Sequence, residues 1–127
     1  MSHTTTRGVR VQVDARYHPD HAAPLARYWF FSYTVTISNV SDERLQLLNR
    51  HWIITDATGH VEHVRGPGVV GQQPALEPGQ SFEYTSACPL ATSMGSMHGT
   101  YEMVRENGER FEAEIAPFTL ADPDSVN

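Results

Sequence analysis

Apolar and polar residues alternate along most of this chain, and this alternation constrains its fold more than any other feature. From Val9 to Tyr17 every second residue is apolar, and the residues between them are charged or polar. From Trp29 to Ile37 the odd positions carry large apolar side chains. Successive side chains of a strand point to opposite faces, so each segment predicts a strand with one buried face. No segment combines a helical period with capping residues, and the sequence therefore predicts an all-β protein.

Turn signals divide the rest of the chain into further short strands. Thr58-Gly59 and Asn107-Gly108 predict hairpins, the second with a type I′ turn in which both residues take positive φ. Pro78-Gly79 fits the centre of a type II turn. The glycine- and proline-rich stretch 66–76 is expected to be a long ordered loop. About seven to eight short strands in 127 residues predict an antiparallel β-sandwich.

The length fits a single domain, because two domains would each have too little core. We expect residues 9–120 to form this domain. Residues 1–8 and 121–127 are expected to be N-terminal and C-terminal tails, since neither carries a run of alternating apolar residues.

Charge and cysteine content exclude several classes of partner. The chain has 15 acidic residues, nine arginines and no lysine, for a net charge of −6. That balance disfavours binding to nucleic acid or to an anionic membrane. No apolar run approaches the ~20 residues that span a bilayer. The first residues do not resemble a signal peptide and Cys88 is the only cysteine, so we expect a cytoplasmic protein without disulfides.

The stretch Leu76-Glu77-Pro78-Gly79, followed by Phe82, resembles the corner between strands E and F of fibronectin type III domains. In those domains Leu-x-Pro precedes an aromatic residue, usually a tyrosine whose hydroxyl ties down the loop. Phe82 occupies that register here, so the resemblance implies packing of the ring without the hydroxyl bond. It favours an immunoglobulin- or fibronectin type III-like sandwich over a barrel.

Three longer motifs resemble the ApaG family. They are Arg50-His51-Trp52-Ile53-Ile54-Thr55-Asp56-Ala57, then Gly66-Pro67-Gly68-Val69-Val70-Gly71-Gln72-Gln73-Pro74, and Gly95-Ser96-Met97-x-Gly99-x-Tyr101. They occur in the order expected for the family, and the similarity runs from about Val11 to Leu120. The chain is thus identified as a member of that family.

The resemblance implies a fibronectin-III-like sandwich and a family-level association with cobalt and magnesium resistance or efflux. It implies no settled biochemical activity. Eukaryotic relatives carry the domain beside other modules, which implies a role in binding. We therefore expect a non-catalytic module without cofactors that binds an unidentified protein partner, as a monomer or a weak homo-oligomer.

The segment from Gly66 to Gly71 formally matches the pattern G-x-G-x-x-G. In a dinucleotide-binding fold a helix must follow these glycines, but the prolines downstream prevent one here. Three interpretations stay open: a purely structural loop, a loop that contacts a partner, and a nest of N–H groups that binds phosphate or a nucleotide. The candidate binding residues are Gly66, Gly68, Val69, Val70, Gly71 and Gln72.

The segment Ser93–Gly99 is expected to be a second loop at the same surface. It contains glycines and apolar residues, as a partner-binding loop would. Its candidate residues are Gly95, Met97 and Gly99.

Neither a metal site nor a catalytic site is indicated by the residue pattern. His60 and His63 stand at i and i+3 on an expected strand, so their side chains point to opposite faces. We interpret the histidines as surface residues, with direct divalent-metal binding as the second alternative. Cys88, His98 and the nearby serines lack a nucleophile elbow, so no catalytic residue is assigned.

Overall fold

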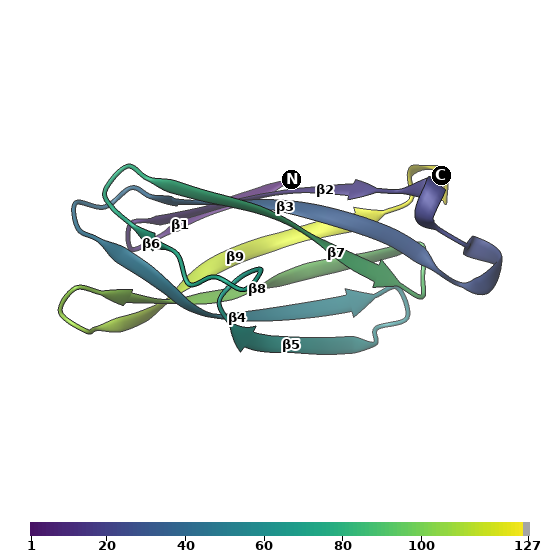
Figure 1. The fold of residues 1–127 in the computed structure, drawn as a ribbon. Helices are drawn as coiled ribbons and strands as arrows, with labels where there is room; N and C mark the ends of the chain where they lie inside the picture. The colour runs from purple at the N-terminus through teal and green to yellow at the C-terminus, as the bar shows by residue number, and fades with distance from the viewer. Residues whose placement is uncertain (126–127) are drawn as a thin grey trace.

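A computed structural model describes residues 1–125, which form two antiparallel sheets packed face to face (Figure 1). One sheet has the order β1-β2-β3-β7 and the other the order β5-β4-β8-β9, with β6 paired to β4. The predicted all-β sandwich is confirmed, with nine strands in these residues instead of seven or eight. The strands are β1 (Ser2–Thr6), β2 (Val9–Tyr17), β3 (Trp29–Asn39), β4 (Leu45–Asp56), β5 (Val61–Pro67), β6 (Ala75–Leu76), β7 (Ser81–Leu90), β8 (Met94–Arg105) and β9 (Arg110–Ala121).

Short 3₁₀ turns are the helical elements of residues 1–125, and none is long or apolar enough to cross a membrane. Two of them, η1 (Pro19–His21) and η2 (Pro24–Ala26), lie between β2 and β3. The third, η3 (Pro123–Ser125), follows β9.

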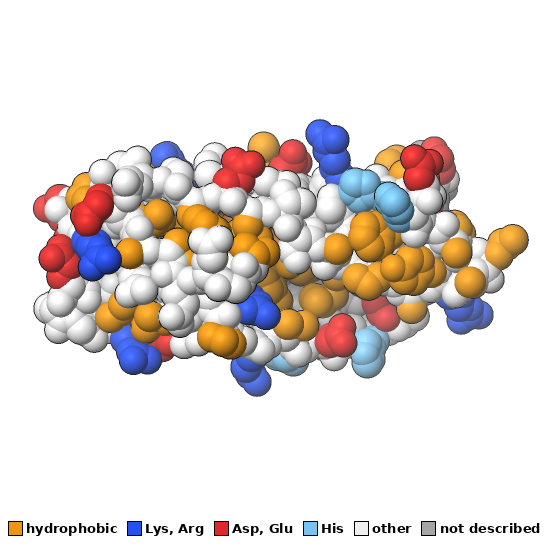
Figure 2. Space-filling model, viewed as in Figure 1, with side chains coloured by type: hydrophobic (Ala, Val, Ile, Leu, Met, Phe, Trp, Pro, Cys, Tyr) orange, Lys and Arg blue, Asp and Glu red, His pale blue; other side chains and the backbone are white. Residues whose placement is uncertain are grey.

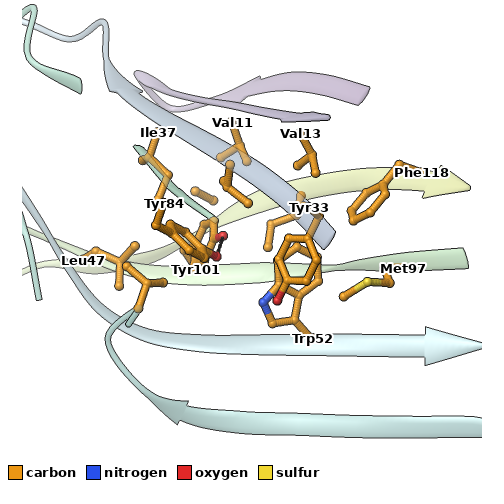
Figure 3. Packing of buried hydrophobic residues seen from close by; sticks show 14 of the residues in the cluster. Val11, Val13, Tyr33, Ile37, Leu47, Trp52, Tyr84, Met97, Tyr101 and Phe118 are labelled. Atoms are coloured by element: carbon orange, nitrogen blue, oxygen red, sulfur yellow. Dashed lines mark hydrogen bonds between the residues drawn. The ribbon is translucent and has the colours of Figure 1, made fainter. Parts of the chain in front are cut away.

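The alternating apolar residues form the core between the sheets, as their period predicts. Val9, Val11 and Val13 are buried, whereas Arg10 and Gln12 are exposed. Aromatic residues fill the middle of this core, where the Tyr33, Trp52, Tyr84 and Tyr101 side chains gather (Figure 3). The ring centroids of Tyr33 and Trp52 lie 5.1 Å apart in an edge-to-face arrangement, a favoured geometry for aromatic pairs.

The two long sides of the sandwich differ. On one side β1 and β2 pack against β9 and close the core. On the other side the outermost strands are β7 in one sheet and β5 in the other. Figure 2 looks onto this second side, where apolar side chains lie exposed along the line between the sheets. A single blue side chain lies among them, and it is an arginine because the chain has no lysine.

Residues 1–8 were expected to be a tail, and that prediction is wrong for Ser2–Thr6. They form strand β1, with Thr4 paired to Val11 of β2. Arg7 and Gly8 both take positive φ, 47° and 86°, in the tight turn between these strands. The strand was missed because it is made of serine, histidine and threonine, whose alternation carries no apolar signal.

The expected C-terminal tail at 121–127 is also partly ordered. Ala121 ends β9, and the backbone N–H of Asp122 donates to Ser93 O at 2.9 Å. Residues 126 and 127 lie outside the described residues. The folded unit therefore extends beyond 9–120 at both ends.

The predicted turns occur at their expected places, with one change of type. Gly79 has φ +86° and Gln80 N–H donates to Glu77 O, as in a type II turn. At Asn107-Gly108 only Gly108 takes positive φ, and its N–H donates to Arg105 O at 3.0 Å. This pattern is a type I turn followed by a glycine bulge, the next commonest hairpin connection after type I′.

Candidate functional site

The glycine motif forms the end of β5 and a tight turn. Val69 and Gln72 exchange backbone hydrogen bonds in both directions, at 2.8 and 2.9 Å. Gly68 and Gly71 take φ +62° and +79°, and Val70 between them takes φ +44°. A side chain at Gly68 would meet Gln72 O at 2.2 Å, so this position admits only glycine.

The turn separates two residues that were expected to act together. Val69 has 0% of its surface exposed and belongs to the core, whereas Val70 is 55% exposed. The prediction that Val69 contacts a partner is therefore wrong. Of the two valines, Val70 presents its side chain to solvent.

The backbone amides of the turn are largely used inside the protein. Gly68 N–H donates to Leu48 O at 2.8 Å, and the N–H groups of Val69 and Gln72 bond each other's carbonyls. An anion nest needs successive N–H groups that point to a common ligand. These internal bonds favour the structural interpretation of the glycine motif.

Arg50 of β4 anchors this turn. Its Nη1 donates to Pro67 O at 2.9 Å and to Gly68 O at 3.0 Å. Gly66 pairs with Arg50 across the two strands, and a Cβ at Gly66 would meet the guanidinium at 3.0–3.1 Å. The sequence alone does not show this role, although residues 50 and 66 both stand in family motifs on neighbouring strands.

The second expected loop is a strand. Gly95, Met97 and Gly99 lie in β8, and Met97 is buried in the core. Gly95 and Gly99 allow close approach to β4, where a Cβ would meet Thr55 O and His51 O at 2.7 and 2.0 Å. The prediction of a binding loop at 93–99 is therefore wrong, because these glycines serve strand packing.

A shallow hollow of about 410 Å³ lies on the outer face of the β5-β4-β8-β9 sheet. It is lined by mixed charges: His51 and Arg65 at one end and Glu102 and Glu112 at the other. Asn49 Nδ2 donates to Glu102 Oε1 at 2.7 Å. Glu102 of β8 and Glu112 of β9 thus lie on the solvent face of the sheet.

His51 and His63 stack at the β5 end of this face. Their ring centroids are 5.1 Å apart, and His51 Nε2 lies 2.9 Å from His63 Nδ1. Partial burial, Arg65 and His63 lower the pKa of His51, in that order of importance. The pair is bonded through one shared proton, which requires at least one neutral ring.

Because of the His51–His63 pair, we expect the free energy of unfolding to be lower in acid. Because the folded state lowers the pKa of His51, the unfolded chain binds more protons once the pH falls below about 6.5. The stabilisation is complete above that pH and is lost as the pH falls through the folded-state pKa. Urea unfolding at about pH 5 and about pH 7.5 measures it, with an expected effect below about 1 kcal/mol because solvent screens the pair. His51→Gln should flatten the dependence, and the exposed His3→Gln should leave it unchanged.

The residues considered for catalysis do not assemble. Cys88 is buried, and burial raises the pKa of its thiol to about 11. His98 and Ser96 lie on strand β8 and pair with β4 positions, away from Cys88. One serine–histidine contact does occur, between His18 Nε2 and Ser32 Oγ at 2.6 Å. Ser32 lies within the regular strand β3 and not at a strand-to-helix elbow, and no carboxylate of the described residues is hydrogen-bonded to His18.

The histidines of residues 1–125 do not gather as the ligands of a metal site would. No three histidine, cysteine, aspartate or glutamate side chains in this range come close enough to share an ion. His18 and His21 instead surround Phe30, with ring centroids at 5.8 and 5.6 Å.

Comparison with known proteins identifies the family. The ApaG domain family matches residues 19–105. Protein ApaG of Anaeromyxobacter dehalogenans is 52% identical over 127 residues and covers 100% of both chains. Protein ApaG of Bradyrhizobium diazoefficiens is 48% identical over 98% of this chain and 96% of its own. The crystal structure of a Bordetella pertussis protein named ApaA superposes with a TM-score of 0.88 at 50% identity, covering 97% of each chain. The chain therefore belongs to the ApaG family.

Proposed function

We propose that this chain is a non-catalytic binding module that takes an extended segment of a protein partner along the edge of β5. The observation that carries the proposal is the exposure of this strand. Every residue of β5 except Gly66 is exposed, including Val61 and Val64. An edge strand offers unpaired backbone groups to a further strand, and alternate side chains supply specificity.

The surroundings of β5 support this assignment over the other edges. The β1 and β9 edges face each other and are covered. Edge β7 carries Pro89 inside the strand, which lacks an N–H group for a further strand, whereas the proline of β5, Pro67, is its last residue. The exposed Val70 and the shallow hollow on the outer face of the sheet lie beside β5. Both would supply side-chain contacts for a bound segment.

Photo-crosslinking tests the proposal. A crosslinking amino acid at Val64 should yield a defined adduct, and a synthetic peptide of the crosslinked segment should shift the backbone amides of Val61–Pro67. Val61→Lys should weaken peptide binding about tenfold or more, because it places charge on the edge. The matched control is Val40→Lys, since Val40 and Val61 are both 48% exposed. Peptide-induced shifts outside β5, or equal effects of the two lysines, would refute strand addition.

A further inference from the structure

A small cleft opens between the sheets on the side bounded by β5 and β7. Its volume is about 170 Å³, and its walls come from five strands of the two sheets, β3, β4, β5, β7 and β8. Tyr33, Ser86 and Cys88 line it from the first sheet, and Arg50, Trp52 and Val64 line it from the second. Val64 is 37% exposed, so the cleft is open to solvent at its rim. This volume exceeds the ~30 Å³ share of a single water molecule.

One buried polar group at this cleft has no partner. Trp52 is 2% exposed, and its indole Nε1 makes no hydrogen bond within the described residues. Burial raises the pKa of the nearby Tyr84 hydroxyl, and the Trp52 indole N–H offsets part of this rise, so the indole lies close to that hydroxyl without a hydrogen bond of standard geometry. The Tyr84 hydroxyl instead pairs with the Tyr101 hydroxyl at 2.5 Å (Figure 3). A buried donor without a well-placed acceptor is unfavourable, and a bound acceptor would remove that cost.

Arg50 is the cation that lines the cleft, while at its Cys88 wall burial and, second, the charge of Glu62 raise the pKa of the thiol. Arg50 forms no ion pair with any described carboxylate, and both of its hydrogen bonds to described residues use Nη1. Nε and Nη2 remain available for a ligand. Burial raises the pKa values of the Tyr33, Tyr84 and Tyr101 hydroxyls. The positive charge of Arg50 lowers them by a smaller amount.

These groups define a chemical class of ligand. Arg50, the Trp52 indole and the hydroxyls of Tyr33 and Ser86 together offer donors and one positive charge. A planar carboxylate can accept two bonds from one edge of a guanidinium. Ile54, Val64 and Met97 add apolar walls that suit a short alkyl chain. We propose that the inter-sheet cleft binds a short-chain carboxylate, either a free acid or the side chain of an acidic residue.

The indole resonance of Trp52 reports this binding directly. The chain has two tryptophans, and Trp29 Nε1 is also buried without a partner, so the Trp29 resonance is an internal reference. Titration of the full chain with sodium butyrate should move the Trp52 Nε1–H resonance downfield to saturation and leave Trp29 in place. Trp29→Phe assigns the two signals. Butyramide, the neutral counterpart, should produce no saturating shift.

A pair of hexapeptides distinguishes the two sources of the carboxylate. One has a central glutamate and the other a glutamine. A response to butyrate supports a free acid, and a response to the glutamate peptide alone supports an acidic side chain. Arg50→Gln should weaken either response about tenfold or more, whereas Arg10→Gln, on the exposed face of β2, should not.

The proposal is overturned if no carboxylate moves the Trp52 signal, or if butyramide and the glutamine peptide move it equally. These wild-type titrations decide the question even if Arg50→Gln destabilises the turn that Arg50 anchors. The butyrate titration does not depend on strand addition at β5, so its failure and the failure of the crosslinking experiment are separate results.

Discussion

Replacing Val69 with aspartate is expected to lower the free energy of unfolding by about 4 kcal/mol or more. The Val69 side chain has no exposed surface and lies in the core. A carboxylate there would replace an apolar side chain of the core, and burial of a charge among apolar residues is strongly unfavourable. Urea denaturation followed by tryptophan fluorescence measures the loss, because Trp52 belongs to the same core.

The control for this prediction is the next residue. Val70 is 55% exposed and has φ +44°, a conformation that is strained for a β-branched residue. Aspartate tolerates the left-handed region better than valine, so Val70→Asp should leave the stability unchanged or raise it by up to about 1 kcal/mol. A stable, natively packed Val69→Asp variant would contradict the burial of Val69.

The contrast between these two valines also decides how binding experiments should be designed. A variant altered at Val69 would lose partner binding at every surface, because the whole domain would be destabilised. A variant altered at Val70 alone tests the exposed part of the turn. Only the second type of variant reports on an interaction surface.

The sequence allowed prediction of the strands whose alternation is apolar. β2 and β3 follow directly from period two, because each buries one face against the opposite sheet. The turns at Pro78-Gly79 and Asn107-Gly108 could be placed because glycine is the residue that readily takes positive φ. The alternating apolar residues of β2 and β3 also belong to the core that forms between the sheets.

The features that could not be predicted depend on pairing between distant segments. β1 carries no apolar residue, and its position follows from pairing with β2. The glycines of β8 looked like loop residues because glycine marks both turns and close strand packing. The partnership of Arg50 with Gly66 and Gly68 exists only once β4 and β5 lie side by side.

The candidate site shows the same division. The sequence indicated the glycine motif but not which of its side chains face solvent, since a tight turn reverses direction within one residue. It gave no signal for the inter-sheet cleft, because Tyr33, Arg50, Trp52 and Ser86 come from three strands. Each residue has an ordinary role in its own strand. Their common chemistry arises from packing the sheets.

Replacing Gly99 with alanine is the second change expected to have a large effect. Gly99 of β8 pairs with Trp52 of β4, next to a register shift between Met97 and Gly99 on the β9 side. An added Cβ would lie 2.0 Å from His51 O and 3.2 Å from Trp52 Cα. Both are backbone atoms that cannot rotate away, so the β4–β8 ladder must move apart. We expect a loss of about 3 kcal/mol, at the upper end of the cost of overpacking.

Gly108→Ala separates this steric effect from the general cost of losing a glycine. Gly108 has φ +87° but nothing within 4 Å of an added Cβ, so its replacement should cost about 1 kcal/mol from backbone strain alone. Gly99→Ala should cost clearly more, although no positive φ is involved there, because two strands of the central ladder must separate. Equal losses in the two variants would contradict the close approach of β8 to β4. Gly99 holds β8 against Trp52, which lines the inter-sheet cleft. A larger loss of stability in Gly99→Ala, together with a changed indole resonance for Trp52, would therefore place the damage at the wall of this cleft.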